Sequence, residues 1–223
     1  MFQNFYKHRF AIFFITQLFV LFGALFCAPE IFEKTVLPVL IKLNIAAGIF
    51  LISKNKPLMW MTIGLFILAI CIFGASFFER GMGDNIPMRL TIYSVFYIII
   101  TFQIIRQVWN AEEVDETVII GVMSGYMCLG FLAFFMLMAI EVHQPGSFSG
   151  TLMKSEDITM RGDALMYYAF ITLLTIGYGE IIPVTQVAQK AAILTGLIGQ
   201  FYLVIITAIV VGKYLQHSGR PQE

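Results

Sequence analysis

Two threonines and two glycines near residue 177 form the pattern that points most directly to chemistry. The segment reads Thr172-x-x-Thr175-x-Gly177-Tyr178-Gly179 and continues into Pro183-Val184-Thr185. Glycine adopts backbone angles that other residues avoid, so Gly177 and Gly179 allow successive carbonyl groups to turn toward one axis. Carbonyl oxygens arranged in this way can replace the water shell of a dehydrated cation.

This motif resembles the selectivity filter in the pore loop of tetrameric potassium channels. The resemblance implies a potassium-selective channel that conducts K⁺ passively, with four copies of the Thr-Ile-Gly-Tyr-Gly segment forming one ring and no catalytic chemistry. It assigns ion binding to Thr175, Ile176, Gly177, Tyr178 and Gly179, with K⁺ ions held at the first four of these. We expect no cofactor other than these bound potassium ions.

Residues next to the filter receive supporting roles from the same resemblance. A short pore helix is expected over Ala164–Leu174, carrying Tyr167, Tyr168 and Thr172. Most family members have Asp after the second filter glycine, whereas this chain has Glu180, and Tyr167 stands where the family has Trp. We hypothesise that the Tyr167 hydroxyl bonds to the Glu180 carboxylate and steadies the filter.

The apolar run after the filter is expected to line an inner cavity. Its cavity and gate residues are Gly199, Gln200, Thr207, Val211 and Leu215, with Leu203 on the same helical face. Two roles for Gly199 stay open, a hinge or a site of close helix packing. Gln200 either contacts permeating ions or bonds across helices. Val211 and Leu215 would form a hydrophobic constriction that gates by dewetting.

The composition indicates which environment positions these residues. The chain has 223 residues, of which 59% are hydrophobic and 13% charged, whereas an ordinary globular protein has about 25% charged residues. A core of this size cannot bury such a surplus of apolar residues, so lipid must cover part of it. Equal numbers of basic and acidic residues, 14 of each, argue against a nucleic-acid-binding surface.

Hydropathy divides the chain into six apolar runs close to the length of about 20 residues that crosses a bilayer. They are Phe10–Ala28, Thr35–Ile52, Leu58–Phe78, Leu90–Ile105, Val118–Ile140 and Val187–Leu215. The apolar piece Ala164–Ile176 is too short to cross. We therefore predict an all-α membrane protein with six transmembrane helices, and a re-entrant pore helix and selectivity-filter loop between the fifth and sixth.

The runs also define two expected domains. Residues 1–110 would form a four-span helical domain that resembles a voltage-sensor-like domain without gating charges, and residues 111–223 the pore domain of outer helix, pore helix, filter and inner helix. The fourth run has Arg89 and Arg106 only at its ends. Each charge yields about 2.3 kcal/mol per 100 mV, so we expect a voltage-independent channel.

The expected topology follows from the family, in which the pore loop enters the membrane from outside. This places both termini in the cytoplasm of an integral membrane protein, which we assign to the inner (plasma) membrane of a bacterium. The expected partners are K⁺ ions, membrane lipid and three further copies of the chain in a homotetramer, and no nucleic acid. The gating stimulus is not encoded in any recognisable segment.

Two other functions stay open. A non-selective cation channel shares this architecture, although such pores usually depart from Tyr178 or Gly179. A non-conducting membrane subunit or scaffold would keep the fold while its filter is substituted. A membrane enzyme is disfavoured because His8, His143 and His217 lie far apart in the sequence.

Three charged features have two interpretations each. Lys42, inside the second run, is either functional, paired with Glu141 or Glu30, or a side chain that snorkels to the interface. The acidic stretch Glu112–Glu116 either binds cations or basic partners or is a solvated linker. Glu141 resembles the outer-end Glu that ties the fifth span to the sixth in many channels, or is an interfacial carboxylate.

Overall fold

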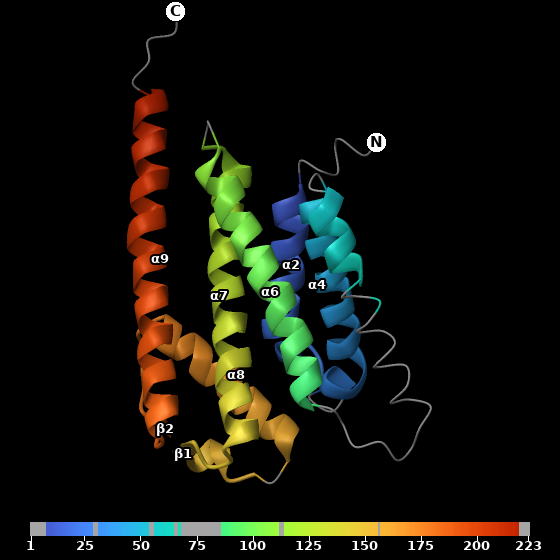
Figure 1. Cartoon of the computed structure of the whole chain (residues 1–223), viewed down its shortest axis with the longest axis vertical. Coiled ribbons are helices and arrows are strands. Elements are labelled where there is room, and N and C mark those ends of the chain that lie inside the picture. Colours follow the sequence, from blue (N-terminus) through green and yellow to red (C-terminus); the bar gives the residue numbers. More distant parts are fainter. Residues whose placement is uncertain are drawn as a thin grey trace, which may run out of the picture. The chain divides into compact units, whose positions relative to one another are not determined.

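The computed structural model describes residues 8–28, 31–53, 56–64, 67, 86–111, 114–155 and 157–218, most of which are helical. The main helices are α2 (Arg9–Phe22), α4 (Leu37–Ile52), α6 (Ile86–Trp109), α7 (Glu116–His143), α8 (Ile158–Leu173) and α9 (Gln186–Ser218) (Figure 1). Two short strands, β1 (Phe148–Gly150) and β2 (Ile181–Pro183), pair antiparallel. Single turns are η1 (Gly23–Leu25), η2 (Phe32–Val36) and η3 (Thr151–Met153).

Three helices in the described part of the chain are long and apolar enough to cross a membrane. They are Ile86–Trp109, Glu116–His143 and Gln186–Lys213, with 24, 28 and 28 residues. They contain the fourth and fifth predicted runs and most of the sixth. For these three segments the predicted helices are confirmed, with the length and apolar composition that a membrane-crossing helix needs.

The first two predicted runs form shorter helices. The apolar helices Arg9–Leu25 and Leu37–Ile52 reach only about 25 Å at 1.5 Å per residue, less than the hydrocarbon core of about 30 Å. Most of the third run, Leu58–Phe78, lies outside the described residues. The six-span arrangement accordingly stays a prediction.

The chain divides into two compact units. Unit 1 contains Met1–Phe78, Ile99–Met127 and Gly212–Glu223, and unit 2 contains Glu79–Ile98 and Cys128–Val211. Helices α6, α7 and α9 each contribute to both units. The candidate filter, α8 and both strands belong to unit 2. The expected domain boundary near residue 110 stays a prediction.

Unit 1 contains a buried polar contact between α2 and α7. The Gln17 side chain donates from Nε2 to the Ser124 carbonyl oxygen at 3.3 Å and accepts from the Ser124 hydroxyl at 2.8 Å. Both residues are fully buried. Nearby, Asn44 of α4 donates to the Thr16 hydroxyl of α2 at 2.9 Å. Such hydrogen bonds join helices whose surroundings are otherwise apolar.

Unit 2 is held by aromatic packing. The Phe131 ring of α7 meets the Phe170 ring of α8 edge-on, with centroids 5.6 Å apart, and Tyr97 of α6 packs on Phe131 at 5.1 Å. Aromatic rings at this spacing add an attractive term to the burial of their area. This packing fixes α8, which carries the filter, against α7.

Polar residues mark where α7 and α8 begin. Asp115 accepts a hydrogen bond from the Val118 amide at 2.9 Å, and Asp157 accepts one from the Thr159 amide at 2.8 Å. Each carboxylate satisfies an amide that has no partner within its helix.

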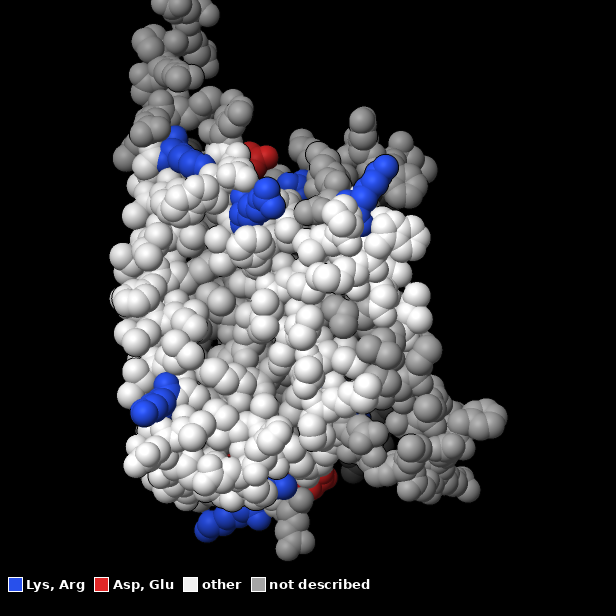
Figure 2. All heavy atoms as spheres, viewed as in Figure 1, with Lys and Arg blue, Asp and Glu red and all other residues white. Residues whose placement is uncertain are grey.

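Charged side chains are also unevenly distributed over the surface. Figure 2 shows that, on the face drawn, Lys and Arg gather mainly near the helix ends and uncharged side chains cover most of the surface between.

Candidate functional site

The filter motif follows directly from the C-terminal end of α8. This helix has 16 residues and ends at Leu173. The amide of Thr175 bonds to the Thr172 carbonyl at 3.0 Å, and the amides of Ile176 and Gly177 bond to the Ile171 carbonyl at 2.9 and 3.4 Å. The N–H groups at the start of the filter therefore point back toward α8.

The backbone of the filter alternates in handedness. Thr175, Gly177 and Gly179 have φ angles of 58°, 55° and 89°, and Thr175 is the one non-glycine residue with positive φ in the described part of the chain. A β-branched residue in this region is a conformational outlier, and the left-handed region costs about 1–2 kcal/mol for an L-residue. Because positive φ recurs at every second residue, successive carbonyl groups turn toward the same side.

The filter is uncovered in a single chain. Ile176 is 48% exposed and Tyr178 is 74% exposed. No described residue donates a hydrogen bond to the carbonyl oxygens of residues 175–178. These oxygens are therefore available as ligands, and the apolar side chains beside them require a covering surface.

The structure brings Tyr167 and Glu180 together. The hydrogen bond with the Glu180 carboxylate is the main reason why the pKa of the Tyr167 hydroxyl is raised from 10.0 to about 12. The Oε1 atom of Glu180 is buried without a hydrogen-bond partner. The residue that follows the filter thus interacts with the helix that precedes it, as hypothesised from the sequence. The effect of this contact on conduction stays a prediction.

Tyr168 and Thr172 lie on α8 at a spacing of one helical turn. Burial raises the pKa of the Tyr168 hydroxyl, while its hydrogen bond with Thr172 lowers it. The Tyr168 ring also packs on Phe148 of β1, with centroids 5.6 Å apart. Tyr168 therefore connects α8 with the strand β1, a contact that sequence reasoning did not predict.

The predicted cavity face of α9 is exposed in the single chain. Gln200, Leu203, Thr207 and Val211 are exposed, whereas Tyr202 and Ile206 are buried. The side chain of Leu215 lies outside the described residues. The exposed face is free to line a cavity in an assembly, and its role there is not tested by the single chain.

Gly199 lies where α9 crosses the end of α8. A Cβ atom at this position would collide with the Leu173 carbonyl oxygen and lie 3.0 Å from Leu173 Cδ1. Only glycine allows the two backbones to come this close. The structure therefore gives Gly199 a role in close packing, and the hinge role stays a prediction.

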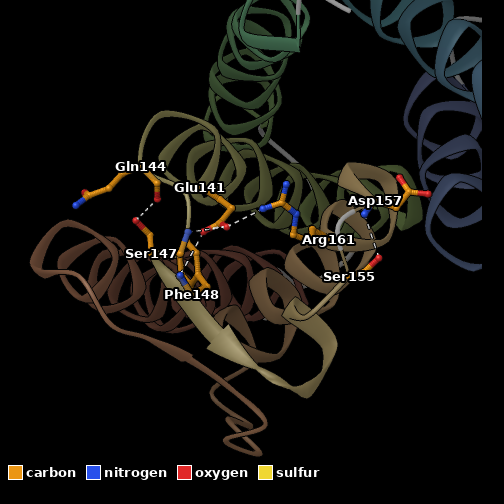
Figure 3. A network of polar contacts seen from close by, with 8 residues as sticks. Glu141, Gln144, Ser147, Phe148, Ser155, Asp157 and Arg161 are labelled. Atoms are coloured by element: carbon orange, nitrogen blue, oxygen red, sulfur yellow. Dashed lines mark hydrogen bonds and ion pairs between the residues drawn. The ribbon is translucent and has the colours of Figure 1, made fainter.

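A buried carboxylate stands at the end of α7. Glu141 is 3% exposed and accepts hydrogen bonds from the amides of Gly146 and Phe148 at 3.1 and 3.3 Å (Figure 3). Arg161, in the first turns of α8, donates to the same carboxylate at 3.2 Å. The resemblance led us to expect that Glu141 ties the fifth span to the sixth. In the described part of the chain Glu141 instead contacts the following loop and α8.

The loop after α7 pairs with the segment after the filter. Phe148, Ser149 and Gly150 of β1 lie opposite Pro183, Ile182 and Ile181 of β2. The Val184 amide donates to the Ser147 carbonyl at 2.8 Å, and the Thr185 hydroxyl donates to the Ser147 hydroxyl at 3.2 Å. Strands of three residues are too short to show an alternation of apolar and polar residues, so this pairing could not be predicted from the sequence.

The structure also gives the positions of Lys42, of part of the acidic stretch before α7, and of Lys213. Lys42 is exposed in α4, and Glu141, one of its two proposed partners, is engaged by Arg161. The other, Glu30, lies outside the described residues. Glu112 and Glu113 lie outside the described residues, while Asp115 caps α7. Lys213 near the end of α9 donates to the carbonyl oxygens of Trp109, the last residue of α6, and of Ala111, which follows that helix.

Comparison with known proteins agrees with this geometry. A family model described as ion channel matches residues 122–216, a stretch that contains most of α7, both strands, α8, the filter motif and nearly all of α9. The match supports an ion channel of the pore-loop type, an integral membrane protein that transports ions rather than an enzyme. No curated protein matches the chain, and no solved structure does.

Proposed function

We propose that this chain is the subunit of a potassium-selective channel that conducts K⁺ passively. The observation that carries the proposal is the alternation of left-handed backbone at Thr175, Gly177 and Gly179, directly after a helix too short to span. A cation that enters a membrane without its water must be coordinated by oxygens, and carbonyl groups that face one side supply them.

The proposed working unit is a homotetramer. One chain contributes one strand of carbonyl oxygens and leaves Ile176, Tyr178 and the apolar side chains of α9 exposed. Four copies around a central axis would cover these residues and close a ring of ligands. Both termini would then lie in the cytoplasm, in keeping with a filter that opens outward.

Each site residue has a role in this proposal. K⁺ ions bind at Thr175, Ile176, Gly177 and Tyr178, and Gly179 completes the filter. Tyr167, Tyr168, Thr172 and Glu180 support the filter from α8 and from its far end. Gly199, Gln200, Thr207, Val211 and Leu215 line the cavity and gate.

We further propose that voltage does not drive gating. Arg89 and Arg106 stand near opposite ends of α6, and the segment between them carries no basic residue. Since each charge contributes only about 2.3 kcal/mol per 100 mV, this helix cannot act as a steep sensor. Conductance measured in planar bilayers should vary little with voltage, and a steep conductance–voltage curve would contradict this.

Ion flux in liposomes tests the channel itself. The purified chain is reconstituted, a K⁺ gradient is imposed, and the measurement is repeated with Na⁺ in place of K⁺ and with Ba²⁺ added. We expect flux carried by K⁺ and not by Na⁺, blocked by Ba²⁺. Equal flux of both ions would indicate a non-selective cation channel. Absence of flux in either ion would indicate a closed gate or a non-conducting subunit, and replacing Val211 and Leu215 by alanine separates these two.

A pair of glycine variants controls this experiment. Within one chain a Cβ atom at Gly177 meets no atom within 4 Å, so Gly177→Ala adds the cost of its φ angle of 55° without a clash inside the subunit. Gly162 in α8 also has open space for a Cβ, without positive φ. We expect Gly177→Ala to lose K⁺ flux and Gly162→Ala to keep it, since only the first disturbs the carbonyl alternation.

A further inference from the structure

The strands β1 and β2 form a small sheet at the point where the chain leaves the filter. We call β1, β2 and Ser147 the clamp. Strand β2 starts two residues after Gly179, and its first residue, Ile181, lies opposite Gly150. The position of β2 therefore determines where the last filter residues can lie.

Gly150 is the tightest point of the clamp. A Cβ atom there would collide with the Glu180 carbonyl oxygen and lie 3.2 Å from both Glu180 C and Ile181 Cα. These are backbone atoms, which cannot move aside as a flexible side chain can. Any residue other than glycine must push β1 away from the segment that follows Gly179.

Strand β1 is itself firmly held. The Phe148 amide donates to the buried Glu141 carboxylate, and the Phe148 ring packs on Tyr168 of α8. The Ser147 hydroxyl, fully buried, donates to the Gln144 carbonyl at 2.7 Å (Figure 3). Because Arg161 of α8 binds the same Glu141, the strand is fixed to α7 and α8 together.

The filter is thus attached at both ends to α8. Its first amides bond to the carbonyl groups of Ile171 and Thr172. Its far end continues into β2, which pairs with a strand packed on Tyr168. The distance over which the five filter residues extend is therefore set by two attachments rather than one.

We propose that the clamp sets the position of the outer filter carbonyls, and that Gly150 is the positioning residue that permits it. This inference rests on the proposed potassium channel. Widening the clamp displaces the Glu180 carbonyl and, through it, the oxygens of Tyr178 and Gly179. Ion selectivity depends on the placement of such oxygens, so the clamp acts on discrimination between ions.

The test compares Gly150→Ala with Gly162→Ala in the full-length protein in liposomes. We expect Gly150→Ala to lower the ratio of K⁺ flux to Na⁺ flux about tenfold, equivalent to about 1.4 kcal/mol of discrimination. The control should keep the ratio of the unmodified protein. A loss of folded protein alone would reduce both fluxes in proportion and leave their ratio unchanged.

Hydrogen exchange supplies a readout that does not depend on conduction. The Val184 amide bonds to the Ser147 carbonyl across the clamp, so its exchange should speed up in Gly150→Ala and not in Gly162→Ala. The variant Thr185→Val removes the hydroxyl bond to Ser147, together with the bond that the same hydroxyl accepts from the Ala188 amide in α9, and should shift the flux ratio in the same direction by less. If Gly150→Ala does not assemble, the flux ratio and the Val184 exchange rate of Thr185→Val test the role of the clamp.

The outcomes separate this inference from the function on which it rests. Faster exchange with a lowered flux ratio supports the clamp. An unchanged flux ratio in an assembled clamp variant, beside a selective unmodified channel, overturns the inference and leaves the channel intact. A protein that carries no K⁺, even with Val211 and Leu215 replaced by alanine, overturns the proposed function, and the inference with it.

Discussion

At the scale of single residues, the loop after α8 has two glycines that suit its backbone angles and one threonine for which such an angle is energetically unfavourable. Gly177 and Gly179 accept positive φ readily, whereas Thr175 does so at a φ of 58° despite its branched side chain. Backbone strain of this kind persists only where the surroundings enforce it, and it is concentrated at functional sites. The bonds from the following amides to Ile171 supply that enforcement.

The contact between Tyr167 and Glu180 gives the first prediction. Tyr167→Phe removes the hydroxyl that interacts with the carboxylate after the filter, so K⁺ flux should decline with time severalfold faster than in the unmodified protein. Gly162→Ala is the control on the same helix, because a Cβ atom at that position meets nothing within 4 Å in the chain. Identical flux decay in Tyr167→Phe and the unmodified protein would refute the role.

The raised pKa of the Tyr167 hydroxyl predicts how its contribution to stability depends on pH. Its pKa is raised from 10.0 to about 12, so the stabilisation it provides is fully present below about pH 10 and is lost as the pH rises through about 12. The difference in melting temperature between the unmodified protein and Tyr167→Phe should therefore be constant from pH 6 to about pH 10. A difference that vanishes near neutral pH would show that another group titrates there.

At the scale of helices, the approach of α9 to α8 predicts an asymmetry between two glycines. Gly199→Ala forces α9 away from the Leu173 carbonyl and should destabilise the protein by about 1–3 kcal/mol, as overpacking does. Gly212 on the same helix has nothing within 4 Å of an added Cβ. Thermal unfolding should show a loss for Gly199→Ala and none for Gly212→Ala, with K⁺ flux reduced only in the first.

The elements that the sequence predicted are those with a strong local signal. Hydropathy located the three long helices, and the glycine spacing located the loop in which Thr175, Gly177 and Gly179 have positive φ. The start of α8 at Ile158 was missed, because the apolar run is broken by Arg161, Gly162 and Asp163, although Asp157 caps that start. A hydropathy profile does not detect a capping residue, and here the cap alone marks the start of the helix in the sequence.

The missed parts of the candidate site depend on contacts between residues distant in the sequence. Gly150 gains its importance only when Glu180 lies against it, and the pairing of Glu141 with Arg161 joins two helices. Neither Gly150 nor Arg161 stands in a pattern that marks it. Such residues are found from the folded chain, because their chemistry is supplied by their neighbours.

At the scale of the whole molecule, the uncovered filter predicts a fixed number of subunits. Because one chain supplies one set of carbonyl oxygens, a subunit with a disturbed filter should inactivate the ring that contains it. Equal amounts of unmodified chain and Gly177→Ala, folded and assembled together, should then retain about one sixteenth of the K⁺ flux if four subunits assemble at random.

Random assembly of two subunits would instead retain about one quarter of the flux, and independent chains would retain half. The control mixes unmodified chain with Gly162→Ala and should keep full flux, since a Cβ at that position meets open space. Varying the mixing ratio gives a curve whose steepness reports the number of subunits. A straight line would exclude a shared filter, because every chain would then conduct on its own.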